Sequence, residues 1–256
     1  MLAAVSRDED LLRGGIGPSK WTGQGRVAVE PLAFVSEDGT WTSIPCSTDK
    51  QGNCLKFERE YLSKPHDYTV VGSDGYGAAV HAKPTSLSEC FDYGTTGTYS
   101  GNTIKRSTIA ASSGQPFTET EPIRPMGKKD TLAIRALLTK FVPNKLDSPN
   151  GVKVLVVTLN DQELYVLQRA FEDMPEDGHR SLVFGIGVVQ PHAFHLLYWK
   201  KNTQDENERV VGTLHLKSGH DFLITVVSDP ESHSYHVYGI RGGRLSLVYA
   251  GGGSSC

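Results

Sequence analysis

Hydrophobic positions along this chain fall in short runs rich in Val, Thr, Tyr and Phe, and polar turns separate the runs. The 27 glycines and 13 prolines are spread along the whole length. β-Branched and aromatic residues favour strands, whereas Gly and Pro favour the turns between them. The pattern predicts a mainly β protein made of two antiparallel β modules.

The N-terminal part predicts a mobile segment over 1–25 and then a small antiparallel β module over 26–110. That module opens with RVAVEPLAFV, followed by the turn EDG and the run TWTSIPC, which is a hairpin signal. The run LKFEREYL at 55–62 fits either a strand or one to two turns of helix.

The pattern changes in the middle of the chain. Residues 111–129 are rich in Ser, Thr and Pro with little apolar content, and predict a linker. An apolar stripe at three- and four-residue spacing follows, predicting one clear helix over about 130–141 that Pro143 ends. The helix and the strands after it form the predicted second module, 130–256.

Within the second module, two passages align. Thr158-Leu159 and Thr213-Leu214 are each followed by a polar turn, an acidic residue and an apolar strand, and then by two more strands. The spacing predicts a two-unit β-meander repeat of the propeller-blade type. Chance similarity of ordinary hairpins is the alternative.

The second of these units carries TLHLKSGHDFLITV and YHVYGIRGGRLSLVYAGGG, and in this it resembles degenerate FG-GAP or VCBS-like repeats of bacterial extracytoplasmic proteins. The resemblance covers residues ~151–256 and implies this strand order and an extracytoplasmic setting. Family loops bind calcium, which takes six to eight oxygens. Only Asp221 among residues 216–221 is a carboxylate, and Lys217 would repel the ion. We therefore expect no cofactor.

Histidines concentrate in the C-terminal third, and three residues there form a candidate metal site. His215 and His220 flank a predicted turn, and Asp221 follows directly. The alternative is that these are solvent-facing histidines of turns and strands. His233 and His236 are three residues apart, so on a strand they point to opposite faces.

Aromatic residues near predicted turns are the remaining candidates for binding. Trp41, Tyr76 and Tyr93 would suit a carbohydrate or peptide surface, and the alternative is that they fill small β cores. No G-x-S-x-G motif and no Gly-rich phosphate loop before a helix occurs, so no catalytic residue is predicted.

All four cysteines lie in loop-like stretches, and Cys256 ends a flexible Gly/Ser tail. Of three connectivities, Cys46–Cys54 and Cys90–Cys256 are the expected disulfides. Four reduced thiols in a cytosolic protein are the alternative, while the spacing of the first pair disfavours zinc.

Net charge and hydropathy limit the classes of partner and the cellular location that the sequence predicts. A net charge of −3 and a pI near 6.3 give no reason to expect nucleic acid. No apolar run reaches the ~20 residues of a membrane span. The N-terminus lacks the basic and long apolar regions of a signal peptide, so an extracytoplasmic location requires a signal absent from this chain; the alternative is cytoplasmic.

The sequence therefore predicts a non-catalytic extracytoplasmic binding or structural protein of bacterial type, with a protein, peptide or carbohydrate as ligand. The alternative is a hydrolase with a site between the two β modules.

Overall fold

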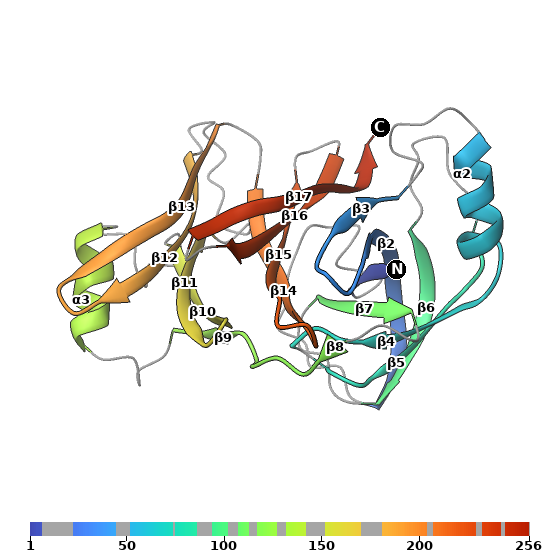
Figure 1. The fold of residues 1–256 in the computed structure, drawn as a ribbon, viewed down its shortest axis with the longest axis horizontal. Helices are drawn as coiled ribbons and strands as arrows, with labels where there is room; N and C mark the ends of the chain where they lie inside the picture. The colour runs from blue at the N-terminus through green and yellow to red at the C-terminus, as the bar shows by residue number, and fades with distance from the viewer. Residues whose placement is uncertain are drawn as a thin grey trace.

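The computed structural model describes residues 1–6, 23–44, 52–73, 75–85, 94–101, 107–112, 117–126, 132–141, 152–169, 181–203, 207–228, 232–241 and 244–255. Strands dominate and form three antiparallel sheets, which confirms the prediction of a mainly β fold. Figure 1 shows the layers in sequence: helix α2, a barrel, two stacked sheets and helix α3.

The barrel is a sheet of six strands in the order β1-β7-β4-β5-β6-β2, closed because β1 also pairs with β2. β3 (Trp41–Ser43) extends it from β2. The six strands are β1 (Leu2–Ser6), β2 (Gly23–Val35), β4 (His66–Val70), β5 (Ala79–Ala82), β6 (Thr95–Gly101) and β7 (Thr108–Ser112).

The sequence predicted that residues 2–6 belong to a mobile segment, but in the structure they form β1. The reason is that both faces of this strand are buried. Ala3 and Val5 belong to the core inside the barrel, whereas Leu2 and Ala4 pack outward against the neighbouring sheet. A strand buried on both faces is apolar without alternation, so LAAVS carries no period-two signal.

The ambiguous run LKFEREYL is helical. It belongs to α2 (Gly52–Phe57) and the π-helical turn η1 (Glu58–Leu62). Phe57 and Leu62 are 2% and 3% exposed and join the barrel core, so this helical segment covers part of the barrel.

The described strands from residue 152 onwards form two four-stranded meanders with the same strand order. In what we call the end sheet, the strands are β10 (Val152–Leu159), β11 (Gln162–Arg169), β12 (Ser181–Gln190) and β13 (Ala193–Thr203). In the middle sheet, between it and the barrel, they are β14 (Asn207–Leu216), β15 (Asp221–Ser228), β16 (Ser232–Arg241) and β17 (Arg244–Ser255).

Each meander carries one extra short strand beside its first strand. β8 (Phe117–Thr118) pairs with β14, and β9 (Arg124–Pro125) pairs with β10. Both come from the predicted linker at 111–129, which therefore contributes to the sheets. Thr158 and Thr213 lie in β10 and β14, the corresponding first strands of the two meanders.

Apolar clusters join successive layers. Leu216 and Ile224 of the middle sheet pack on the outer wall of the barrel, and Val210 and Leu223 on its other face pack against the end sheet. α3 (Leu132–Phe141), the predicted helix, covers the outer face of the end sheet, where Leu138 is fully buried. Burial of each such side chain stabilises the fold by roughly 1.5–3 kcal/mol.

Three buried tyrosines give a prediction for alkaline pH. Burial raises the pKa values of Tyr68, Tyr238 and Tyr249 above the ordinary value of 10.0. Because the folded pKa values lie above the unfolded value, their contribution to stability is complete below pH 10 and is lost as the pH rises further. We expect phenolate absorbance of native protein to stop short of ten tyrosines until unfolding releases the rest. Complete ionisation near pH 10 without unfolding would contradict this.

Candidate functional site

The turn between β14 and β15 is a three-residue hairpin loop. The Gly219 N–H donates to the Leu216 carbonyl at 2.8 Å, and the Leu216 N–H donates to the His220 carbonyl at 2.9 Å. Gly219 has φ +86° and is the left-handed bulge residue that follows the type I turn. The glycine is thus needed for chain reversal.

A second hairpin with the same geometry faces it from the barrel. Between β2 and β3, the Gly39 N–H donates to the Ser36 carbonyl at 3.0 Å, and Gly39 has φ +78°. The Ser218 hydroxyl donates to the Glu37 carbonyl at 2.5 Å. The two turns therefore lie against each other where the barrel meets the middle sheet.

Asp221 links the middle sheet to the end sheet. One carboxylate oxygen contacts His215 Nδ1, and the other accepts the backbone N–H of Asn160. Asn160 and Asp161 form the β10–β11 turn with φ +48° and +58°, as a type I′ turn requires. Both oxygens of Asp221 are thus committed to protein partners.

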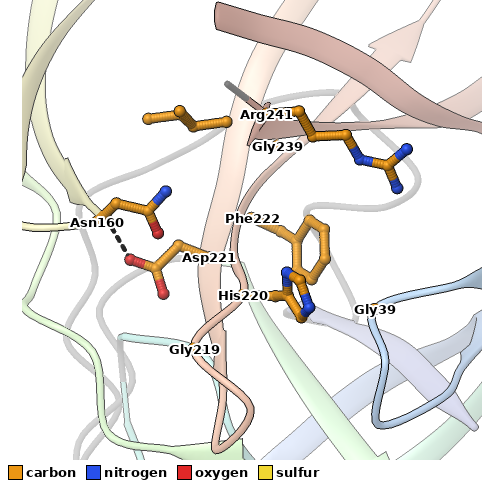
Figure 2. A pocket seen from close by; sticks show the side chains of 9 residues that line it. Gly39, Asn160, Gly219, His220, Asp221, Phe222, Gly239 and Arg241 are labelled. Carbon is orange, nitrogen blue, oxygen red and sulfur yellow. Dashed lines mark hydrogen bonds between the residues drawn. The ribbon is translucent and has the colours of Figure 1, made fainter. Parts of the chain in front are cut away.

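A small open pocket lies where these turns converge, next to the end of β16. Figure 2 shows the Asp221–Asn160 contact on one side and the His220 ring beside Phe222 and Gly39 on the other. The His220 and Phe222 rings stack, with centroids 6.4 Å apart. The residues that line the pocket are Gly39, Asn160, Gly219, His220, Asp221, Phe222, Gly239, Ile240 and Arg241.

The structure does not assemble the predicted metal site. His215 and Asp221 contact each other, but His220 stacks on Phe222 instead of joining them. Within the described ranges, no group of three His, Cys, Asp or Glu side chains that could hold a metal ion occurs. The reason is strand alternation, because His220 directly precedes Asp221 and pairs with Leu216, so its side chain lies on the face of Phe222 and not on the face of His215 and Asp221.

Of the predicted aromatic binding residues, Trp41 is half-buried. It packs edge-on against Phe222 at 5.3 Å and stacks on Tyr249 at 5.7 Å, and its indole N–H is buried without a hydrogen-bond partner among the described residues. Tyr76 lies half-buried in the turn before β5, and Tyr93 lies outside the described residues. Neither Trp41 nor Tyr76 lines the pocket at the β14–β15 turn.

A buried carboxylate that the sequence did not single out joins the barrel to the middle sheet. The side chain of Glu30 in β2 is 3% exposed. It contacts His233 Nε2 at 2.7 Å and accepts the Tyr235 hydroxyl at 2.6 Å, both from β16. The signal was an acidic residue within the apolar run VAVEPLAFV.

A second buried carboxylate lies on the opposite face of β16. Glu208 of β14 accepts the hydroxyls of Tyr238 at 2.6 Å and Thr225 at 2.8 Å, and His236 Nδ1 is 3.5 Å away. His233 and His236 thus point to opposite faces, as their spacing predicted. Each histidine lies beside a different buried glutamate: Glu30 comes from the barrel, whereas Glu208 belongs to the middle sheet itself.

The described cysteine, Cys54, is 4% exposed in the barrel core and is disulfide-bonded. Cys46, Cys90 and Cys256 lie outside the described residues. The pairings Cys46–Cys54 and Cys90–Cys256 therefore stay predictions.

Comparisons with protein-family models, with curated proteins and with solved structures find no match for this chain. The geometry of the chain itself is therefore the basis for a functional proposal.

Proposed function

We propose that this chain is a non-catalytic binding protein whose barrel and sheets form one continuous scaffold. The observation that carries the proposal is the filled contact between the barrel and the middle sheet. Leu32 and Ile109 of the barrel share one apolar cluster with Ile224 of the sheet. Glu30, the buried carboxylate there, is committed to His233 and Tyr235. A carboxylate held in this way is buried and hydrogen-bonded, and would not reach a substrate.

We further propose an extracytoplasmic location, periplasmic or secreted, in a protein of bacterial type. The support is the disulfide-bonded Cys54, since disulfides persist in oxidising compartments, together with the resemblance of residues ~151–256 to bacterial extracytoplasmic repeats. Among the described residues, no helix combines the length and apolar character needed to cross a membrane.

One contact favours the hydrolase alternative. A carboxylate that orients an imidazole, as Asp221 does for His215, is the arrangement of many general bases. Thr118 lies opposite His215 on β8, but its hydroxyl is buried. No Ser or Cys side chain of the described residues hydrogen-bonds to His215. The role of Asp221 in joining the middle sheet to the end sheet through the Asn160 N–H therefore accounts for the His215–Asp221 pair, and no catalytic role is needed.

Purified protein is expected to turn over no chromogenic ester, glycoside or peptide substrate above background. A peptide or oligosaccharide ligand is expected to raise the midpoint of thermal unfolding, because binding to the folded state adds stability. His215→Ala is the control for catalysis. Turnover by the wild-type protein that His215→Ala abolishes would overturn the proposal and favour the hydrolase.

A further inference from the structure

Three polar side chains of the pocket are uncommitted. The side chains of His220, Arg241 and Asn160 line it. None of these three side chains has a hydrogen bond or ion pair to another described residue. The acid of the lining, Asp221, is already satisfied by His215 and the Asn160 N–H, and Asp38 of the neighbouring turn is satisfied by the Ser36 hydroxyl and the Thr40 N–H. The free groups are therefore mainly hydrogen-bond donors, and one of them carries a permanent positive charge.

A second arginine stands beside the first. Arg241 and Arg244 are direct partners across the β16–β17 hairpin, and both are exposed. Like charges directly opposite each other destabilise a β ladder. Among the described residues, no acidic side chain forms an ion pair with either arginine, so a bound anion would relieve this repulsion.

The space for a ligand comes from Gly239. Gly239 and Arg241 are two residues apart on β16 and so lie on one face of it. A Cβ at Gly239 would lie 3.3 Å from the Phe222 ring, which is tighter than ordinary contact. The absence of a side chain thus leaves an opening between the aromatic wall of Phe222 and His220 and the guanidinium of Arg241 (Figure 2).

We propose that this pocket binds the carboxylate of a small organic acid, with Arg241 as its main partner and with Arg244 and His220 adding positive charge and donors. An arginine fork matches a carboxylate with two parallel hydrogen bonds. The proposal rests on the non-catalytic binding function proposed above and gives that function a site and a ligand class.

The test measures binding of glucuronate by NMR titration of the full chain, with glucose as the neutral analogue and inorganic phosphate as a different anion at equal ionic strength. Wild-type protein is expected to bind glucuronate more tightly than either. Arg241→Gln is expected to weaken binding by about tenfold, the usual effect of losing a hydrogen bond to a charged group. Lys153→Gln removes the same charge from an exposed position on β10 and is expected to leave binding unchanged.

The outcomes separate the two proposals. Failure of glucuronate to bind, equal binding by Arg241→Gln and wild type, or equal affinity for phosphate would each overturn the carboxylate pocket. None of these results affects the non-catalytic function, which is contradicted only by substrate turnover that His215→Ala abolishes.

Discussion

Replacing Glu30 by alanine is expected to destabilise the protein by about 1–3 kcal/mol, the usual cost of leaving a buried hydrogen-bonding group without its partner. Glu30 accepts the Tyr235 hydroxyl and contacts His233 Nε2, and all three groups lie between the barrel and the middle sheet. Without the carboxylate, the buried Tyr235 hydroxyl and the half-buried His233 ring lose the partner that β2 provides. Chemical denaturation, followed by tryptophan fluorescence, measures the free energy of unfolding.

The matched control is Glu60→Ala. Glu60 lies 4.0 Å from Lys56, and both side chains are more than half exposed, so this variant is expected to lose less than about 1 kcal/mol. Glu30→Gln keeps one acceptor oxygen and should fall between the two. Equal unfolding free energies for Glu30→Ala and Glu60→Ala would show that Glu30 does not link the barrel to the sheet.

The middle and end sheets were the most predictable part of the fold. Their strands are long, the β10–β11 and β14–β15 turns are marked by Asn-Asp and by glycine, and neighbours in sequence are neighbours in space. The β14–β15 turn could be recognised as a hairpin because Gly219 supplies the left-handed conformation that it needs. Its contact with the barrel turn at Ser36–Thr40 could not be foreseen, because no local pattern specifies which distant loop a turn will touch.

The functional residues were less predictable for the same reason. The sequence grouped His215, His220 and Asp221 around one turn, and of these the structure brings His215 and Asp221 opposite each other. His220 does not join them, because it directly precedes Asp221 and strand alternation places it on the other face, beside Phe222. The partners of Glu30 lie more than 200 residues further along the chain, and period-two alternation cannot reveal that register.

The glycines at the end of the chain were predicted to be flexible, and the structure places them in β17. Gly251, Gly252 and Gly253 all have positive φ, and the last two form a bulge opposite Ser234. A Cβ on Gly252 would lie 2.7 Å from the Leu32 carbonyl oxygen of the barrel. This glycine run thus lets three backbones approach closely at the same contact that Glu30 stabilises.

Gly253→Ala is therefore expected to destabilise the protein by about 2–5 kcal/mol. The added Cβ would lie 2.0 Å from the His233 carbonyl oxygen, so the backbone of β16 or β17 must move. The left-handed conformation at φ +83° adds a cost of about 1–2 kcal/mol for any residue with a Cβ.

Gly77→Ala separates the steric effect from the conformational one, because Gly77 has φ +80° and open space around it. Unfolding free energies should show a loss of about 1–2 kcal/mol for Gly77→Ala and a larger loss for Gly253→Ala. Equal losses would mean that the close approach of β17 to β16 does not contribute to stability.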